Sequence, residues 1–216
     1  MFTEGTSPLK VLAAIGHNGN IDKACIFHPN NKHLIYSLGA SVVIERLSDG
    51  NQEFLYGHDN KIACICVSKC GKYIASGQKT FMGYKADILL WDYEKRAKLA
   101  VFAQHKVIVK SLDFSPNSTH LISIGGSDDG CLATWSIEKL NLICGKEAQP
   151  KNSGLVNCIT YSKTMDDKFV TGGQNTCRVW KLDQEKRKLS FIECAFGKFK
   201  RNITCIEGTI LNYLSR

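Results

Sequence analysis

Three tryptophans recur along this chain at nearly equal distances, and their spacing constrains the fold more than any other feature of the sequence. Trp91, Trp135 and Trp180 are 44 and then 45 residues apart, and each ends a short apolar run. Each run follows a segment of small residues, and that segment follows one in which apolar and polar residues alternate. A repeat of this length indicates a chain built from stacked, similar units of several strands each.

The starts and ends of the units carry further recurring residues. A Gly-His dipeptide occurs at His17 and again at His58, and a partial version occurs at His105. Trp91 is followed directly by aspartate, and a weaker unit before it has Ile44 where the others have tryptophan. A period of about 40–45 residues with Gly-His and Trp-Asp at its ends resembles that of the WD-repeat proteins, whose units are the blades of a β-propeller.

The resemblance implies an all-β fold, a partial WD-repeat β-propeller with about four blades and the start of a fifth. We predict one partial, N-terminal propeller over residues 1–216, with blades at approximately 17–55, 58–102, 105–144 and 154–194 and an incomplete fifth at 197–216. Because propellers usually close with about four to eight blades, we expect a fragment, a splice form or a truncated gene product. We also expect its open ends to leave the isolated chain marginally stable or prone to associate.

The recurring polar residues predict a structural network in each blade. In WD-repeat proteins a histidine, a serine or threonine, an aspartate and the tryptophan indole form a hydrogen-bonded chain, which satisfies polar atoms that burial would leave unpaired. The residues that match this pattern are His58, Ser76, Trp91, His105, Ser123, Asp129, Trp135, Thr171 and Trp180. A Ser-His-Asp set also occurs in hydrolases, but its recurrence with tryptophan at repeat spacing favours the structural role.

The three networks differ in completeness. The third blade has all four residue types. In the second blade Lys85 stands at the aspartate position, and Asp87 follows two residues later. The fourth blade has Gln174 at that position and no histidine. We therefore expect the polar chain to be strongest in the third blade.

Motifs for catalysis, cofactors and metals are missing from the sequence. It contains no G-x-x-x-x-G-K-[ST] phosphate loop and no H-E-x-x-H helix. The glycine-rich segment 125–130 lies between two expected strands, whereas phosphate-binding loops lead into a helix. The ten cysteines include no C-x-x-C pair, which zinc sites usually contain. We expect no enzymatic activity, no cofactor and no metal site.

Charge and hydropathy limit the partners of the chain. The formal charge is +8, with 28 Lys and Arg against 20 Asp and Glu, which suits an anionic partner. The segment 181–201 is the most basic, but such runs are usually solvated, and it has few aromatic residues on which bases could stack. Nucleic acid is therefore not the favoured partner. We expect no membrane partner, because no apolar run approaches the roughly 18 residues of a membrane helix.

The second blade carries an insertion that the other blades lack. The extra residues, 78–85, place Phe81, Met82 and Tyr84 together with Lys85 in a loop between two expected strands. Apolar side chains in an exposed loop mark a candidate contact site for a partner. The alternative is that these side chains pack onto the neighbouring blade.

The segment 73–93, which contains this insertion, resembles the WD-repeat proteins of axonemal doublet microtubules, and weaker similarity covers about 12–204. The resemblance implies a non-enzymatic structural protein of ciliary and flagellar axonemes, in the cytoplasm and the axonemal cytoskeleton. Members of that family lie in the doublet lumen as microtubule inner proteins, contact tubulin and neighbouring inner proteins, and support ciliary motility. The positive charge would then face acidic tubulin. The alternative is a general WD-repeat adaptor for signalling or ubiquitin-ligase complexes, which binds a peptide on the top face of the propeller.

Overall fold

The computed structural model describes residues 11–149, 154–197 and 199–207, and these residues form four sheets of four strands each. The first sheet contains β1 (Cys25–Phe27), β2 (His33–Leu38), β3 (Ser41–Arg46) and β4 (Gln52–Leu55). The second contains β5 (Ile62–Val67), β6 (Tyr73–Gln78), β7 (Lys85–Asp92) and β8 (Ala97–Lys106). The third contains β9 (Val109–Phe114), β10 (His120–Gly125), β11 (Cys131–Ser136) and β12 (Asn141–Glu147). The fourth contains β13 (Val156–Tyr161), β14 (Lys168–Gly173), β15 (Thr176–Asp183) and β16 (Lys188–Glu193).

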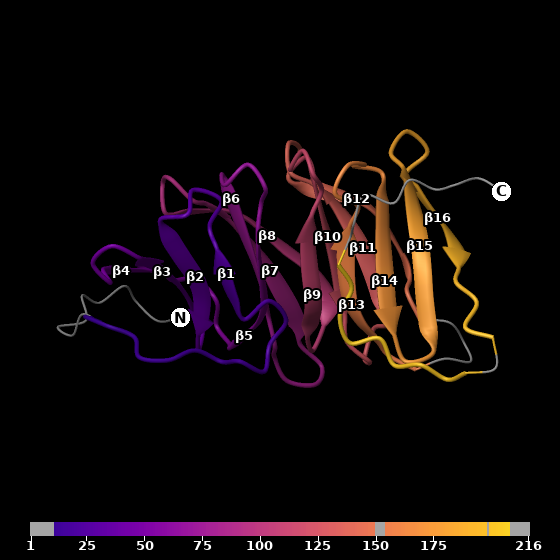
Figure 1. Ribbon diagram of the computed structural model, residues 1–216, viewed down its shortest axis with the longest axis horizontal. Helices are drawn as coiled ribbons and strands as arrows, with labels where there is room; N and C mark the ends of the chain where they lie inside the picture. The colour runs from indigo at the N-terminus through magenta and orange to yellow at the C-terminus, as the bar shows by residue number, and fades with distance from the viewer. Residues whose placement is uncertain (1–10, 150–153, 198, 208–216) are drawn as a thin grey trace.

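Each sheet is an antiparallel meander in which neighbours in sequence are neighbours in space. The four sheets stand in a row in chain order, with β5, β9 and β13 as the adjacent innermost strands of the last three (Figure 1). This arrangement confirms the predicted all-β propeller architecture. In segment 199–207 the structure contains no strand, only an isolated bridge between Asn202 and Gln174, and residues 208–216 of the predicted fifth blade lie outside the described part.

The small residues that recur before each tryptophan let adjacent sheets approach closely. Gly77 in β6 faces the third sheet, and a Cβ atom at this position would lie 2.5 Å from the Val109 Cβ atom and 2.9 Å from the Cys64 sulfur. Both distances are too short for real side-chain contacts. The glycine is therefore required by the spacing between the second and third sheets rather than by a turn.

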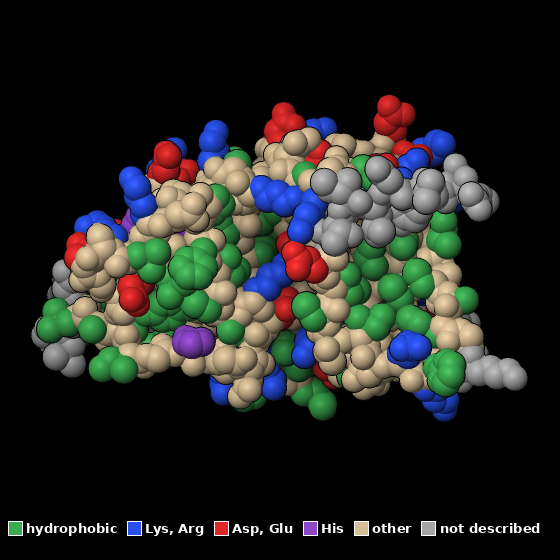
Figure 2. All heavy atoms as spheres, viewed as in Figure 1, with side chains coloured by type: hydrophobic (Ala, Val, Ile, Leu, Met, Phe, Trp, Pro, Cys, Tyr) green, Lys and Arg blue, Asp and Glu red, His purple; other side chains and the backbone are tan. Residues whose placement is uncertain are grey.

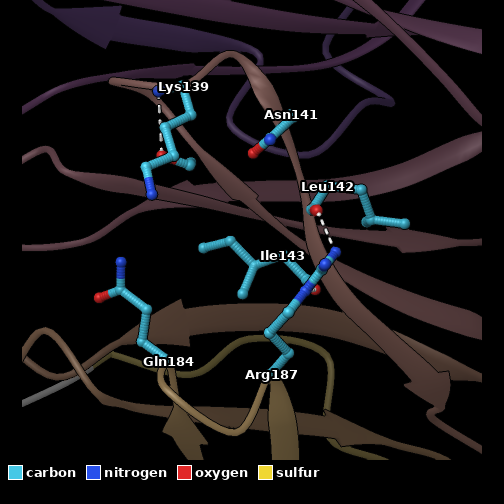
Figure 3. Close-up of a pocket in the computed structure, with 7 residues that line it drawn as sticks. Lys139, Asn141, Leu142, Ile143, Gln184 and Arg187 are labelled. Atoms are coloured by element: carbon cyan, nitrogen blue, oxygen red, sulfur yellow. Dashed lines mark hydrogen bonds between the residues drawn. The ribbon is translucent and has the colours of Figure 1, made fainter.

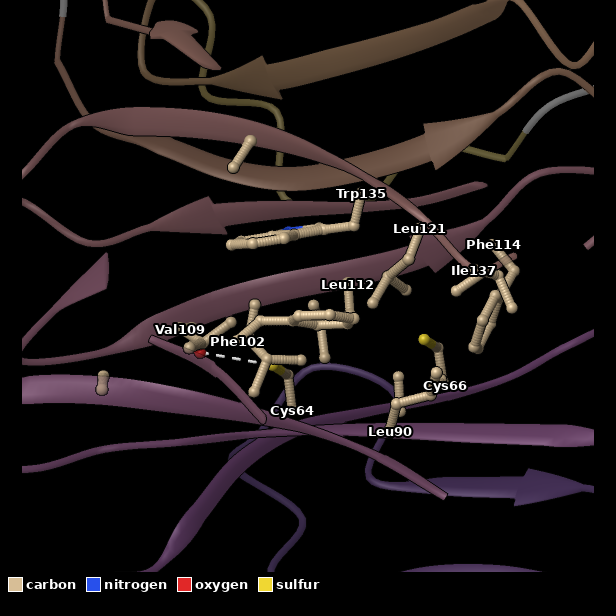
Figure 4. Packing of buried hydrophobic residues seen from close by; sticks show 14 residues of the cluster. Cys64, Cys66, Leu90, Phe102, Val109, Leu112, Phe114, Leu121, Trp135 and Ile137 are labelled. Atoms are coloured by element: carbon tan, nitrogen blue, oxygen red, sulfur yellow. Dashed lines mark hydrogen bonds between the residues drawn. The ribbon is translucent and has the colours of Figure 1, made fainter. Parts of the chain in front are cut away.

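Apolar side chains fill the spaces between neighbouring sheets. Between the second and third sheets, the rings of Phe102 and Trp135 stack with their centroids 4.6 Å apart (Figure 4). Phe169 and Trp180 belong to the corresponding cluster between the third and fourth sheets. Between the first and second sheets Ile44, which occupies the tryptophan position of its unit, packs in one cluster with Trp91. Each sheet is thus stabilised by burial against its neighbours.

A short segment before β1 ties the inner strands together. Asp22 accepts a hydrogen bond from the Ser111 hydroxyl at 2.6 Å, and Lys23 donates to Asp113 at 2.7 Å. The other carboxylate oxygen of Asp113 accepts from the Tyr161 backbone N–H at 2.7 Å. Burial acts to lower the pKa of Lys23, but the charge of Asp113, its hydrogen bond to Lys23 and the neighbouring Asp22 and Cys66 together outweigh burial and raise that pKa. The segment thereby connects the chain before the first sheet to the third sheet and, through Asp113, to the fourth.

The outward face of the first sheet is partly covered by the chain that precedes it. Ala14 packs against Tyr36 and Val43, and its backbone N–H and carbonyl both bond the Gln52 side chain, at 2.6 and 3.0 Å. Leu12 and its neighbours remain exposed. In the part of the chain that the structure describes, no helix is long and apolar enough to cross a membrane.

Candidate functional site

A buried polar chain crosses the second sheet and begins at the histidine that follows β4. The His58 Nδ1 donates to the Gln78 side-chain oxygen at 3.0 Å, and its Nε2 accepts from the Ser76 hydroxyl at 2.7 Å. The Trp91 indole N–H donates to the same hydroxyl at 2.8 Å. The structure thus brings together the three residues assigned to this blade. The fourth member is Gln78, which the sequence analysis missed, and neither Lys85 nor Asp87 takes its place.

The third sheet holds the corresponding chain with an aspartate. His105 lies 2.9 Å from an Asp129 carboxylate oxygen through Nδ1 and 2.7 Å from the Ser123 hydroxyl through Nε2, while Trp135 donates to that hydroxyl at 2.9 Å. Burial acts to raise the pKa of Asp129, but the hydrogen bond and charge of His105 outweigh it and hold that pKa below its usual value. Because His105 lies in β8, the outer strand of the second sheet, this chain links the second sheet to the third.

The Ser-His-Asp set of the third sheet is closed to any substrate. Ser123 and His105 are both fully buried. The Ser123 oxygen that would act as a nucleophile already accepts the Trp135 indole N–H. A hydrolase needs its serine at a surface where a carbonyl carbon can approach, with donors placed for the oxyanion. The arrangement therefore supports a structural role for these residues.

The first and fourth sheets depart from the pattern. In the fourth sheet, Trp180 donates to the Thr171 hydroxyl at 2.9 Å. Among the described hydrogen bonds, the polar chain of this sheet extends no further. The buried Arg178 instead donates to the Ala148 carbonyl oxygen at 3.0 Å and so connects the third sheet to the fourth. In the first sheet His17 is exposed, with its ring centroid 6.2 Å from that of Tyr36.

Acid is expected to destabilise the chain through His58. Burial lowers the pKa of His58 to about 4, whereas the unfolded chain titrates near 6.5. Folding therefore favours neutral His58, so its contribution is complete above about pH 6.5 and is lost as the pH falls towards 4. Between pH 7.5 and pH 5 this contribution decreases by about 2 kcal/mol. Urea unfolding of the wild type and of His58→Asn at both pH values measures it.

The free energy of unfolding of His58→Asn is expected to depend less on pH than that of the wild type. The exposed histidine variant His17→Asn serves as the control and keeps the wild-type dependence. Equal pH dependence in His58→Asn and in the wild type would contradict the assignment.

The insertion of the second sheet forms an exposed turn on a rigid base. Phe81, Met82 and Tyr84 expose 73, 85 and 65% of their surfaces, so they do not pack onto the neighbouring blade. The backbone beneath them is fixed, because Thr80 donates to the Val107 carbonyl at 2.6 Å and Val107 donates to that of Tyr84 at 3.1 Å. Lys85, which the sequence places in the loop, is instead the first residue of β7. There it pairs with β8, the outer strand of the second sheet.

A basic pocket lies beside the base of this turn. It has a volume of about 290 Å³, and its lining includes the exposed side chains of Lys61, Lys79 and Lys110 together with Asp22. Lys79 immediately precedes the turn and bridges to Ile108. Basic and hydrophobic side chains lie together at the lower edge of the molecule, where β6 leads into β7 (Figures 1 and 2). Apolar and cationic groups are therefore combined on one rim.

A second, smaller pocket lies at the opposite ends of the strands, between the third and fourth sheets. Its volume is about 140 Å³, and Arg187 points from the β15–β16 turn towards β12 (Figure 3). The guanidinium donates to the Ile143 carbonyl at 2.9 Å and to the Leu142 carbonyl at 3.1 Å. Part of the basic segment 181–201 is thus used in contacts within the protein, and Lys198 of that segment lies outside the described residues.

The cysteines and other metal-binding side chains form no centre in the described residues. All ten cysteines are free, and Cys64 and Cys66 are buried in the second sheet. Across 11–149, 154–197 and 199–207, no three histidine, cysteine, aspartate or glutamate side chains are placed to hold a metal ion.

Comparison with protein families identifies the repeat. The WD40 model, described as WD domain, G-beta repeat, matches residues 51–92 and 96–136. Each match begins near the outer strand of one sheet and ends with the third strand of the next, at β7 and β11. The family unit is therefore offset by one strand from the sheet. This offset explains why His58 and His105 precede the sheets whose serine and tryptophan they contact.

Curated relatives extend the similarity over most of the chain. Cilia- and flagella-associated protein 52 of Bos taurus is 46% identical over 198 residues, which are 92% of this chain and 32% of the relative. The protein of the same name from Chlamydomonas reinhardtii is 39% identical over 195 residues, 90% of this chain and 31% of the relative. The chain thus spans about a third of the length of these relatives.

Solved structures show the same fold at low sequence identity. The structure titled "Structure of U3-55K" superimposes with a TM-score of 0.64 at 19% identity and covers 84% of this chain and 54% of that one. This superposition supports the fold, whereas the relationship in sequence is shown by the family match and the ciliary relatives. The chain is a WD-repeat protein and a homologue of cilia- and flagella-associated protein 52.

Proposed function

We propose that this chain is a non-enzymatic structural protein of ciliary and flagellar axonemes that binds tubulin and neighbouring inner proteins in the lumen of the doublet. The proposal is supported by relatives named for cilia and flagella in mammals and in a green alga. It is also supported by the burial of Ser123 and His105, which favours a structural role for the Ser-His-Asp set of the third sheet. A rigid β-sheet scaffold that presents loops is well suited to binding other proteins.

The exposed turn of the second sheet is the observation that carries the proposal. Phe81, Met82 and Tyr84 supply apolar surface that is already ordered by backbone hydrogen bonds, so binding costs little conformational entropy. The neighbouring lysines of the basic pocket supply positive charge for an acidic protein surface such as that of tubulin. Aromatic and methionine side chains are also enriched in protein interfaces.

Replacing the three apolar side chains of the turn is expected to weaken binding to microtubules without destabilising the fold. The triple variant Phe81→Ser, Met82→Ser, Tyr84→Ser removes exposed groups only, so the urea midpoint should stay near that of the wild type. Co-sedimentation with axonemal doublet microtubules should show a Kd at least about tenfold higher, since such anchors contribute more than about 1.4 kcal/mol together.

The matched control is the pair Phe27→Ser and Ile192→Ser, which removes side chains that are 65 and 76% exposed on the two end sheets. This pair should retain wild-type sedimentation. Equal binding by the triple variant would exclude the turn as the contact. Ready extraction of the full-length homologue from doublets by salt would contradict the luminal position, and selective binding to ubiquitin-ligase or signalling subunits instead of tubulin would favour the adaptor alternative.

A further inference from the structure

Two cysteines face each other at one end of the fourth sheet. Cys177 lies in β15, and Cys194 directly follows β16. The antiparallel register pairs Arg178 with Glu193, so one further step along each strand sets Cys177 opposite Cys194. The Cys194 N–H donates to the Cys177 carbonyl oxygen at 2.8 Å, which continues the ladder through this pair. Because side chains of opposite residues project from the same face of a sheet, the two thiols share one surface.

The separation of the two residues suits a disulfide. Hydrogen-bonded antiparallel pairs have Cα atoms about 5.5 Å apart, inside the range of about 4.4–6.8 Å found for disulfides. Burial, and after it the charge of Cys194 and a hydrogen bond between the two side chains, raises the pKa of Cys177 to about 12. Both thiols are free and half-buried, so a small oxidant can reach them while the strands hold them together.

Other cysteines lack this combination of pairing and access. Cys64 and Cys66 are buried, and burial raises the pKa of both thiols well above the ordinary value. Cys25 and Cys70 are exposed, but they lie in the first sheet and in a turn of the second, so no ladder sets them opposite each other. The sequence spacing of the cysteines does not reveal the pair, because only the register of β15 and β16 brings it together.

We propose that Cys177 and Cys194 form an oxidant-sensitive modification site whose product is a reversible disulfide across the end of β15 and β16. With hydrogen peroxide as the oxidant, one thiol loses its proton, and the resulting thiolate sulfur attacks a peroxide oxygen and breaks the O–O bond. The sulfur becomes a sulfenic acid, and the displaced hydroxide takes up the thiol proton to give one water. The second thiol then attacks the sulfenic sulfur, forms the S–S bond and releases a second water. The two sulfurs lose two electrons and two protons in total, and the peroxide takes up both.

The bond would fasten the outermost strand of the fourth sheet. Residues 177 and 194 enclose the β15–β16 turn, so the crosslink restricts the unfolded chain between them. We expect the oxidised protein to have a Tm a few degrees higher than the reduced protein, and slower amide hydrogen exchange in β16. A thiol reductant reverses both changes by exchange with the disulfide.

Peptide mapping of the full chain tests the proposal directly. Trypsin is expected to release residues 169–178 with Cys177 as the sole cysteine, and residues 189–198 with Cys194 as the sole cysteine. The reduced protein is treated with hydrogen peroxide, remaining thiols are blocked with N-ethylmaleimide, and the digest is analysed by mass spectrometry. The expected product is the 169–178 peptide joined to the 189–198 peptide, two hydrogen atoms lighter than the sum, and absent after dithiothreitol.

Two variants supply the controls. Cys177→Ser should lose the linked peptide and the rise in Tm, whereas the pair Cys25→Ser and Cys70→Ser, which removes exposed thiols, should keep both. The proposal is overturned if peroxide oxidises Cys25 or Cys70 while 177 and 194 stay unlinked. It is also overturned if Cys177 or Cys194 forms a disulfide with Cys158 or Cys205 as readily as Cys177 and Cys194 form one with each other. None of these outcomes depends on microtubule binding.

Discussion

Replacing Phe102 by alanine is expected to lower the free energy of unfolding by about 3–5 kcal/mol. Phe102 extends from β8 of the second sheet, is almost fully buried, and stacks on Trp135 of the third sheet. Removal of the ring therefore leaves a cavity between two sheets, and the rigid ladders on either side limit how far the gap can collapse. Urea unfolding followed by tryptophan fluorescence measures the loss.

The adjacent residue supplies the control for this substitution. Val101 precedes Phe102 in the same strand, faces the other way and is 47% exposed. Val101→Ala should change stability by no more than about 0.5 kcal/mol, as is usual for exposed positions. Similar effects of the two substitutions would show that the sheets are not coupled through this stack.

The second large effect is expected for Ser123→Ala, which should cost about 2–6 kcal/mol. The Ser123 hydroxyl is the only atom that contacts both His105 Nε2 and the Trp135 indole N–H within the described network. Its removal leaves two buried polar groups without partners, and each such group costs about 1–3 kcal/mol. The change in shape is small, so the loss reports on hydrogen bonding rather than on packing.

A serine on the neighbouring loop provides the comparison. Ser127 is exposed and contacts only Asp128 among the hydrogen bonds described, at 3.3 Å. Ser127→Ala should leave the urea midpoint within experimental error of the wild type. If Ser123→Ala were equally silent, the polar chain of the third sheet would contribute little to stability, and its recurrence would need another explanation.

Much of the fold follows from periodicity alone. Trp91, Trp135 and Trp180 occupy equivalent places in the third strands of successive sheets, as their spacing predicts. Their regular distances reflect a unit that is repeated as a whole, so one recognised unit locates the others. The same reasoning places Ile44 in the third strand of the first sheet, although the sequence offers no tryptophan there.

The departures from the pattern were harder to foresee because they depend on neighbours in space. Counting back from Trp91 leads to Lys85 because the insertion shifts the count, and Gln78 at the end of β6 occupies the position instead. Gln78 directly follows Gly77, and this polar residue at the end of the small-residue segment is the sequence signal that identifies the fourth member of the chain. Arg178 links the third and fourth sheets through a contact with Ala148, thirty residues earlier, which no local motif announces.

The tie made by Asp22 and Lys23 has a consequence for how the chain is made. These residues precede their partners Ser111 and Asp113 by 89 and 90 positions. At about 5–20 residues per second, a ribosome needs roughly 5–20 s to synthesise that interval, whereas a hairpin forms in about 1–10 μs. The four strands of the first sheet are therefore complete well before Ser111 and Asp113 have been synthesised. Asp22 and Lys23 are made before the first sheet, but they can reach these two partners only after the inner strand of the third sheet has been synthesised.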